Sequence, residues 1–202
     1  MLPRRSADAH KYTAGQVLAV VGSRAFSGAA VLSTAAAYRV GAGAVVATVP
    51  TLAAAAVDLR NAEVMVDAQP ETEAGTLAAS ARDAILARAD RADAVLVGCG
   101  LGRDPETTDL VRSLVATVAA PLVLDADGLS AFAGDADRLR QRTGPLVLTP
   151  HLGELRRLLG DDTFDPENRI ETCRRLASQW DATLVLKGMP SVIGLPDGRV
   201  LV

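Results

Sequence analysis

The stretch AVLVGCGLG, residues 94–102, is a short apolar run that leads directly into glycines at every second position. An apolar run of this length, bounded by turn residues, is typical of a buried β-strand. Gly98, Gly100 and Gly102 permit positive φ angles and a close approach to the backbone. Their spacing differs from GxGxxG, so they carry no dinucleotide fingerprint. We interpret the turn as a ligand contact, and a purely structural turn is the alternative.

The same apolar pattern recurs along the chain and predicts an α/β fold. The predicted strands are rich in Val and Leu and comprise residues 16–22, 44–50, 63–66, 93–98, 121–125, 144–149 and 182–188. Because most of them are uniformly apolar, they predict strands buried on both faces, as in parallel sheets. Amphipathic segments separate them, which predicts a mostly parallel sheet with helices on both faces. Residues 190–202 hold a Pro-Asp-Gly turn between two apolar runs and predict an antiparallel hairpin.

One predicted helix begins at Asp165 and Pro166, which would supply an N-cap and a first-turn proline. The residues that recur on one face of this helix are Ile170, Cys173, Ala177 and Trp180, and this spacing predicts that Cys173 and Trp180 lie in the core. We find no internal repeat or linker and predict a single domain over residues 1–202. Because the chain stops inside the second strand of the hairpin, we expect this domain to be incomplete at its C-terminus.

Composition excludes several classes of protein. The 202 residues carry a formal net charge of −3 and a pI near 5.4, without the basic footprint of nucleic-acid-binding proteins. No apolar run reaches the ~18 residues of a membrane span, and the N-terminal residues lack the apolar stretch of a secretory signal. Cys99 and Cys173 are too far apart for a CxxC motif. We therefore expect a cytoplasmic protein with no membrane or nucleic-acid partner and no metal site of its own.

Two further loops at predicted strand ends carry polar groups. The loop GSRAFSGAA, residues 22–30, places N–H groups and hydroxyls at a helix N-terminus, which suits an anion. A tight packing turn explains this loop equally well. Asp125 and Asp127 follow another strand and could orient a sugar hydroxyl or hold Mg²⁺ through water. Helix capping by Asp127 is the alternative.

The last two predicted strand ends carry a histidine and a lysine. His151, one of only two histidines, lies near a helix N-terminus, where the dipole lowers the pKa of an imidazole. Glu154 would serve the first turn of that helix. Lys187 is one of only two lysines, and Gly188 beside it leaves the backbone bare. An ammonium at this position suits a nucleotide phosphate or a neighbouring carbonyl.

Five segments of the chain, in this order, match a known family. They are HKYTAGQVLAVVGSRAFSGAAVLSTAAAYRVGAG, GCGLGR, LVLDADGLS, LTPHLGE and LVLKGMPSVI. They resemble the ADP/ATP-dependent NAD(P)H-hydrate dehydratases of the ribokinase-like superfamily, over residues 10–202. The resemblance implies a ribokinase-like enzyme, often a homo-oligomer such as a tetramer, that uses ADP or ATP with Mg²⁺. Its reaction returns the hydrated cofactors NADHX and NADPHX to NADH and NADPH.

The resemblance also implies site residues by position. Those that would contact the hydrated nicotinamide nucleotide are Ala29, Gly100, Gly102 and His151. Those that would bind the adenine nucleotide are Lys187, Gly188, Met189, Pro190 and Ser191. By this resemblance the three glycines of the opening stretch would lie against the hydrated dinucleotide.

The sequence departs from the family pattern in three places. Cys99 and Leu152 stand where the family commonly has proline. The family's GSGD segment, which carries the aspartate that deprotonates the substrate hydroxyl, has no counterpart; Gly134 and Asp135 lack its glycine-rich lead. The catalytic base is therefore unassigned. The leading hypothesis is a dehydratase domain without that segment. The alternatives are an inactive adenine-nucleotide or NAD(P)-binding module and a small-molecule kinase of the same superfamily.

Overall fold

The computed structural model describes residues 13–142, 144–160 and 167–202. Its strands form a single sheet in the order β3-β2-β1-β4-β5-β6-β7-β8-β9. The strands are β1 (Gln16–Val20), β2 (Ala44–Pro50), β3 (Met65–Gln69), β4 (Ala94–Val97), β5 (Leu122–Leu124), β6 (Leu146–Leu148), β7 (Thr183–Leu186), β8 (Val192–Gly194) and β9 (Val200–Leu201). No helix in the described ranges is both long and apolar enough to cross a membrane.

Strands β1 to β7 pair in parallel, and β8 and β9 add to the edge in antiparallel pairing. The predicted mostly parallel sheet and the terminal hairpin are therefore confirmed. The predicted strand at 63–66 is wrong in position, because β3 starts at Met65 and ends at Gln69. Asp67 lies inside β3. Its side chain is buried, and its carboxylate accepts hydrogen bonds from Thr48 and Arg88. That buried carboxylate interrupts the apolar pattern on which the sequence prediction depended.

Helices lie on both faces of the sheet. They are α1 (Ser27–Val40), α2 (Thr51–Arg60), η1 (Ala79–Ala81), α3 (Arg82–Ala89), α4 (Pro105–Thr117), α5 (Asp127–Ser130), η2 (Ala136–Gln141), α6 (Leu152–Leu159) and α7 (Arg169–Trp180). Alternate residues of β1 separate the two faces, since side chains along a strand point to opposite sides. Ala19 joins the core under α1 and α2, whereas Leu18 and Val20 join the larger core under α3, α4 and α7.

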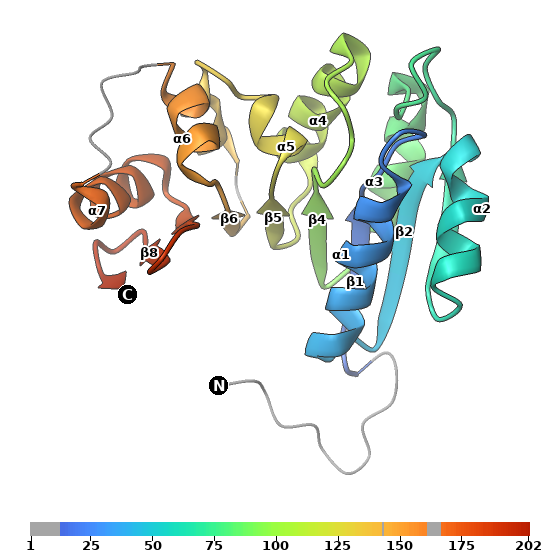
Figure 1. Cartoon of the computed structure of the whole chain (residues 1–202), viewed down its shortest axis with the longest axis horizontal. Coiled ribbons are helices and arrows are strands. Elements are labelled where there is room, and N and C mark those ends of the chain that lie inside the picture. The colour runs from blue at the N-terminus through green and yellow to red at the C-terminus, as the bar shows by residue number, and fades with distance from the viewer. Residues whose placement is uncertain (1–12, 143, 161–166) are drawn as a thin grey trace.

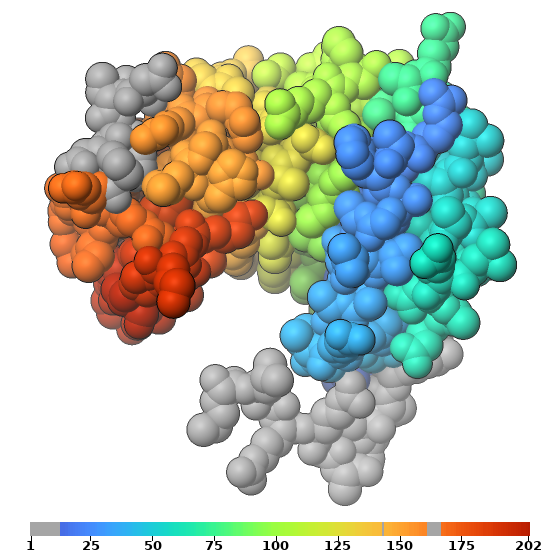
Figure 2. Space-filling view, in the orientation of Figure 1, coloured from blue at the N-terminus to red at the C-terminus, as the bar shows by residue number. Residues whose placement is uncertain are grey.

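The two faces are not equally covered. In Figure 1, α1 and α2 lie in front of the strands at the β1–β3 side, while β4 and β5 are seen without a described helix before them. On that face the middle residues of β5 and β6, Val123 and Val147, are only partly buried, as are Val185 and Ile193 farther along. Figure 2 shows a recess there, between α1 in blue and the C-terminal strands in red.

The partly covered sheet face corrects the prediction that the strands are buried on both faces. Burial of the strands on both faces holds for β1 and β2 but not for β5 to β8 within the described residues. Apolarity on both sides of a strand predicts that each side is covered, but it does not identify the covering element.

Helix α7 largely fulfils its prediction. Cys173, Ala177 and Trp180 are fully buried, as expected for core residues. The predicted start at Asp165 and Pro166 lies outside the described residues, and the described helix begins at Arg169. Ile170, which recurs on the same face in the sequence pattern, is 47% exposed. The buried side of α7 also includes Leu176, so its centre is turned away from Ile170.

Candidate functional site

The five strand ends singled out in the sequence are neighbours in the sheet. Strands β1, β4, β5, β6 and β7 are adjacent in that order and parallel. Their carboxyl ends therefore bring the loops after residues 20, 97, 124, 148 and 186 into one row. The order of the sheet reverses between β1 and β4, and open α/β sheets bind ligands at such a reversal.

The loops after β1 and β4 are fastened to each other by backbone hydrogen bonds. The Gly22 N–H donates to the Cys99 carbonyl at 2.8 Å, and the Gly98 N–H donates to the Val20 carbonyl at 3.1 Å. A Cβ atom added to Gly100 would lie 2.7 Å from the Cβ of Ala29. The structure thus brings together two predicted substrate residues, Ala29 and Gly100, that lie 71 positions apart in the sequence.

Each glycine of the turn adopts a positive φ, of 132°, 71° and 82° for Gly98, Gly100 and Gly102. Each also lies against the chain itself. A Cβ on Gly98 would overlap the carbonyl oxygen of Asp125, and one on Gly102 would lie 2.9 Å from Cγ2 of Thr76. Packing within the protein therefore suffices to require these glycines. Their predicted contact with the dinucleotide stays a prediction.

Asp127 fastens the same turn from the neighbouring strand end. Its carboxylate accepts hydrogen bonds from the Gly102 N–H at 3.0 Å and from Arg103 Nε at 3.2 Å. The alternative in which Asp127 caps helix α5 is wrong, because Ala126 is the N-cap and no side chain caps that helix. Both Asp127 oxygens are used to hold the loop, a role that sequence spacing does not indicate.

Lys187 lies between two carboxylates. Its Nζ is 2.8 Å from Oδ1 of Asp125 and 3.6 Å from Oε2 of Glu154. Burial would raise the pKa of Asp125, but the hydrogen bonds from Lys187 and Thr149 and the Lys187 charge outweigh it and lower that pKa. Burial would lower the pKa of Lys187, and the two carboxylates outweigh it and raise that pKa. Lys187 is therefore a fixed cation, with 42% of its side chain exposed.

His151 begins helix α6 and caps it. Its Nδ1 accepts hydrogen bonds from the Gly153 and Glu154 N–H groups at 2.9 and 3.2 Å. Glu154 returns the interaction by accepting from the His151 N–H at 2.8 Å, which completes a capping box. Because Nδ1 is an acceptor, a neutral ring carries its proton on Nε2. Glu154 thus serves the first helical turn, as expected, and also faces Lys187.

The segment predicted to bind the nucleotide, residues 187–191, follows β7, and its first residue is held by a backbone hydrogen bond. The Lys187 N–H donates to the Pro150 carbonyl at 2.9 Å, so the ends of β6 and β7 stay together. Arg169 of α7 donates to the Leu186 carbonyl at 3.3 Å and fills the space beside Gly188. Met189 is 99% exposed. Sequence reasoning missed Arg169, because nothing in its local sequence indicates that α7 packs beside this strand end.

The described residues do not form a protein cage for Mg²⁺. No group of three or more His, Cys, Asp or Glu side chains in the described ranges is arranged to hold a metal ion. The Asp125 carboxylate accepts a hydrogen bond from Lys187, and the Asp127 carboxylate accepts hydrogen bonds from Gly102 and Arg103. Mg²⁺ commonly binds through substrate phosphates and few carboxylates, so a nucleotide would have to bring most of its ligands.

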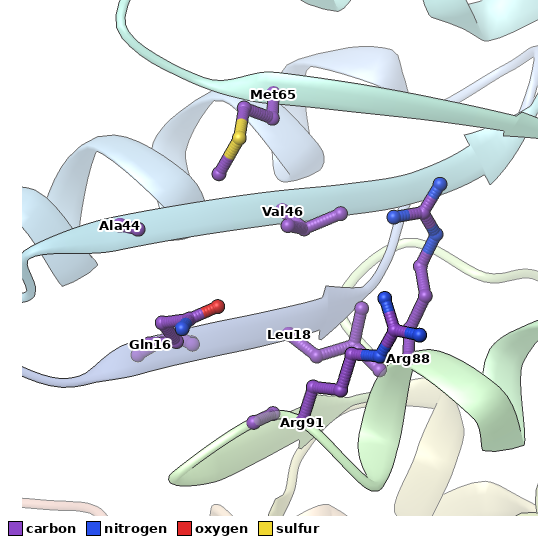
Figure 3. A pocket seen from close by; sticks show the side chains of 9 residues that line it. Gln16, Leu18, Ala44, Val46, Met65, Arg88 and Arg91 are labelled. Atoms are coloured by element: carbon purple, nitrogen blue, oxygen red, sulfur yellow. The ribbon is translucent and has the colours of Figure 1, made fainter. Parts of the chain in front are cut away.

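A separate cavity of about 200 Å³ lies at the opposite, amino ends of β1, β2 and β3. Figure 3 shows Leu18 and Val46 on its floor, with Arg88 and Arg91 of the α3 region at its side. Arg88 is paired with Asp67 at 2.7 Å. None of the predicted site residues lines this cavity, and we place the candidate site at the carboxyl edge, where the charged groups converge.

The fold and this edge define the class of the protein. A ribokinase-like superfamily protein from Enterococcus faecalis has the same fold, with a TM-score of 0.77 over 96% of this chain and 64% of its own, at 24% identity. Phosphofructokinase-2 from Escherichia coli shares the fold at 12% identity, with a TM-score of 0.63 over 92% of this chain and 77% of its own. The predicted ribokinase-like α/β fold is confirmed.

Within that class, the chain belongs to the NAD(P)H-hydrate dehydratase family, whose model matches residues 17–202. It is 45% identical over 202 residues to the bifunctional NAD(P)H-hydrate repair enzyme of Moorella thermoacetica, covering 100% of this chain and 38% of that protein. The corresponding Salinibacter ruber protein is 45% identical, over 98% of this chain and 37% of its own length. The chain thus spans well under half the length of these curated relatives.

A solved relative resembles the chain in both sequence and structure. The ADP/ATP-dependent NAD(P)H-hydrate dehydratase of Bacillus subtilis, co-crystallized with ATP/Mg²⁺, has a TM-score of 0.75 at 30% identity. The alignment covers 98% of this chain and 67% of that one. The family predicted from the five sequence segments is therefore confirmed.

Proposed function

We propose that this chain binds an adenine nucleotide and NADHX or NADPHX at the carboxyl edge and takes part in nucleotide-dependent dehydration of the hydrated cofactor. The observation that carries the proposal is the family match over residues 17–202. Nucleotide-dependent dehydration of NAD(P)H hydrate, the activity for which the solved Bacillus subtilis relative is named, requires a site for a nucleotide and a site for the hydrated cofactor. The row of strand ends from β1 to β7 offers both on one edge.

The chemistry of such a reaction is a phosphoryl transfer followed by an elimination. ADP or ATP transfers its terminal phosphoryl group to the C6 hydroxyl of the hydrated ring, which gives up its proton. The ring nitrogen lone pair then expels inorganic phosphate as the C6–O bond breaks, and loss of a proton from C5 of the resulting iminium ion forms the C5=C6 double bond and restores NADH or NADPH. Phosphorylation converts hydroxide into a good leaving group, and such transfers depend chiefly on positioning and charge stabilisation.

Residues at one end of the row suit the nucleotide. Lys187 offers an exposed ammonium whose positive charge is maintained by Asp125 and Glu154. Residues 188–191 follow it at the surface, with the Ser191 hydroxyl held on the Gly188 carbonyl at 3.2 Å. We assign Lys187, Gly188, Met189, Pro190 and Ser191 to nucleotide binding.

The loops after β1 and β4, together with His151 after β6, suit the hydrated cofactor. Ala29 lies partly exposed at the N-terminal turn of α1, directly against Gly100. The His151 side chain is 54% exposed, its Nδ1 accepts from the Gly153 N–H, and its Nε2 lies 3.6 Å from Oε1 of Glu154. We assign Ala29, Gly100, Gly102 and His151 to binding the hydrated nicotinamide nucleotide.

No residue of this edge is assigned as the catalytic base. Asp125, Asp127 and Glu154 each hold another group of the protein. This observation favours a second candidate function, an adenine-nucleotide or NAD(P)-binding module without turnover. The proposed setting is the cytoplasm, where the two cysteines, both free in the structure, would stay reduced. A homo-oligomeric assembly is part of the proposal.

The test has a binding arm and a turnover arm. Calorimetry measures ADP and ATP binding to the 202-residue chain, and the rise in absorbance of regenerated NADH measures turnover of NADHX. Turnover with ADP as well as ATP supports the dehydratase and excludes a simple small-molecule kinase. Nucleotide binding without turnover supports the binding module. If the chain binds neither ADP nor ATP, both candidate functions, the dehydratase and the binding module, are contradicted.

A further inference from the structure

The segment proposed to bind the adenine nucleotide, residues 187–191, is the turn between β7 and β8. Leu186, the last residue of β7, pairs with Val192, the first residue of β8, so these two residues form the base of the turn. Residues 188–191 are exposed. An exposed turn with few buried contacts is among the least stable parts of a fold. Its conformation therefore depends on what holds its base.

Helix α7 holds both sides of that base. Nη2 of Arg169 donates a hydrogen bond to the Leu186 carbonyl at 3.3 Å. One helical turn later, Sγ of Cys173 donates to the Val192 carbonyl at 3.8 Å. Residues four positions apart lie on the same face of a helix. One face of α7 therefore contacts both ends of the nucleotide turn.

The peptide group between Leu186 and Lys187 is held from two directions. Its carbonyl accepts from Arg169, and its N–H donates to the Pro150 carbonyl at 2.9 Å. In a trans peptide these two polar atoms point to opposite sides. Two hydrogen bonds on opposite sides fix the orientation of the peptide plane. That orientation sets the direction in which the Lys187 side chain leaves the backbone.

The Arg169 guanidinium also occupies the space beside Gly188. A Cβ atom added to Gly188 would lie 2.5 Å from Nη2, 3.0 Å from Cζ and 3.1 Å from Nη1 of Arg169, which are its three nearest atoms. Gly188 does not have a positive φ. The backbone would therefore accept alanine at this position, and Arg169 is what excludes it. The bare backbone at Gly188 thus accommodates a side chain of this protein.

Arg169 is unfavourable for helix α7 itself in two respects. It is the first residue of the helix, where the positive end of the helix dipole disfavours a cation. Its Nε is buried and makes no hydrogen bond with any described residue, and a buried donor without a partner costs stability. The stability of α7 therefore does not explain an arginine at this position, whereas the contacts with Leu186 and Gly188 do.

We propose that Arg169 is a positioning residue for the adenine nucleotide. It fixes the backbone from Leu186 to Gly188 and thereby presents the Lys187 ammonium and the turn that follows. The inference rests on the proposed function, since it concerns the segment assigned there to the nucleotide. A planar guanidinium can donate to Leu186 and fill the space beside Gly188 together, which the compact ammonium of a lysine cannot do. Its charge also favours an anionic ligand at the turn.

Removal of the guanidinium tests the proposal. Arg169→Ala should lower the affinity for ADP by about 10-fold, in the range of a hydrogen bond from a charged donor. The affinity for NADHX should be unchanged, because a loss confined to the nucleotide separates positioning from a general structural role. Calorimetry measures both affinities. Arg169→Lys should not restore ADP binding.

Arg174 supplies the matched control. It lies on the same helix, and its Nε donates to the Gly198 carbonyl at 3.2 Å. Arg174→Ala removes a bond of the same kind away from the nucleotide turn and should bind ADP as the wild type does. Fluorescence of the buried Trp180 reports whether each variant is folded.

The contact with Gly188 gives a second test. Gly188→Ala alone should displace the guanidinium and weaken ADP binding about as much as Arg169→Ala does. In a chain that already carries Arg169→Ala the space is vacant, so adding Gly188→Ala should cause little further loss. Non-additive losses are expected of two residues that act through one contact.

Amide hydrogen exchange of the unliganded chain reports on the turn without any nucleotide. Arg169→Ala and Gly188→Ala should each speed exchange in residues 187–191, and Arg174→Ala should not. Mass spectrometry of peptic fragments measures this exchange. Unchanged exchange in the Arg169→Ala variant would mean that Arg169 does not hold the turn, and would overturn the proposal.

The binding results separate failure of this inference from failure of the proposed function. A wild-type chain that binds no ADP contradicts the proposed function, and the inference with it. If the wild type binds ADP and Arg169→Ala binds it equally well, only the inference is overturned. Additive losses from Arg169→Ala and Gly188→Ala also overturn it, because Gly188 would then act by direct contact with the nucleotide. Equal weakening of ADP and NADHX overturns it as well.

Discussion

The glycine turn after β4 and the charged cluster at the ends of β5, β6 and β7 lie on the same edge but are fixed by different forces. Gly98, Gly100 and Gly102 are fixed by steric exclusion, since each φ is positive and the space beside each is filled. Lys187 and Asp125 are fixed by charge and remain partly exposed. The turn should therefore tolerate no side chain, whereas the cluster should tolerate substitution with loss of binding and little loss of stability.

Replacing Gly98 by alanine should have the largest effect. Its Cβ would overlap the Asp125 carbonyl, which belongs to the backbone of the neighbouring strand end and cannot rotate away. We expect a loss of more than about 4 kcal/mol in the free energy of unfolding, or failure to fold. Urea denaturation followed by Trp180 fluorescence measures it.

Gly198 supplies the matched control for that substitution. It has a similarly positive φ of 84°, but nothing lies within 4 Å of its Cβ position. Gly198→Ala should cost only about 1 kcal/mol, the strain of the backbone conformation alone. Equal losses in the two variants would contradict the steric account of the turn.

Lys187→Met tests the opposite behaviour in the charged cluster. The substitution keeps the aliphatic stem and removes the ammonium, so adenine-nucleotide affinity should fall by about 10- to 100-fold, in the range of a charge-assisted hydrogen bond. The unfolding free energy should change by less than about 1 kcal/mol, because the side chain is 42% exposed. Calorimetry with ADP measures the first, and Arg174→Met on α7 is the control. An unchanged affinity would remove Lys187 from the nucleotide site.

His151 combines both kinds of role, and two substitutions separate them. His151→Ala removes the acceptor for the Gly153 and Glu154 N–H groups and should cost about 1 kcal/mol of stability. His151→Asn can still cap the helix, so its stability should be close to that of the wild type. Both variants lose the imidazole Nε2–H and should bind NADHX more weakly. If His151→Asn binds NADHX normally, His151 acts only as a cap.

The sequence predicted most strands because their apolar runs are short and bounded by turns. It also placed Ala29, Gly100, His151 and Lys187 at strand ends, and the parallel topology brings those ends together. What it could not supply was side-chain pairing across the sheet. Asp125 and Lys187 lie 62 positions apart and meet through the pairing of three strands. No local spacing encodes that contact, and the same holds for the carboxylate of Asp127 on the glycine turn.

The partly covered face of β5 to β8 illustrates the same limit. Val123 and Val147 are as apolar as Leu122 and Leu146 beside them, so their pattern predicts burial on both sides. Burial depends on which element covers the face, and that depends on the arrangement of helices. Local apolarity therefore predicts strands reliably but not the layer that lies over them.

Asp125→Asn should have the smallest effect on the free energy of unfolding. It tests directly whether charge holds the cluster at the ends of β5, β6 and β7. The lowered pKa of Asp125 means that its contribution to stability is present above the ordinary carboxyl pKa and is lost as the pH falls through the folded value. The raised pKa of Lys187 means that its contribution is present below the ordinary lysine pKa and is lost as the pH rises through the folded value. The difference in unfolding free energy between wild type and Asp125→Asn should therefore be greatest between about pH 5 and pH 9. It should stay below about 1 kcal/mol, since Lys187 is partly solvated, and shrink in acid and in strong alkali.

Asp83→Asn, in an exposed pair with Arg82, should show no such profile. A difference independent of pH would mean that Asp125 holds its strand end by shape alone, and the contrast with the glycine turn would disappear.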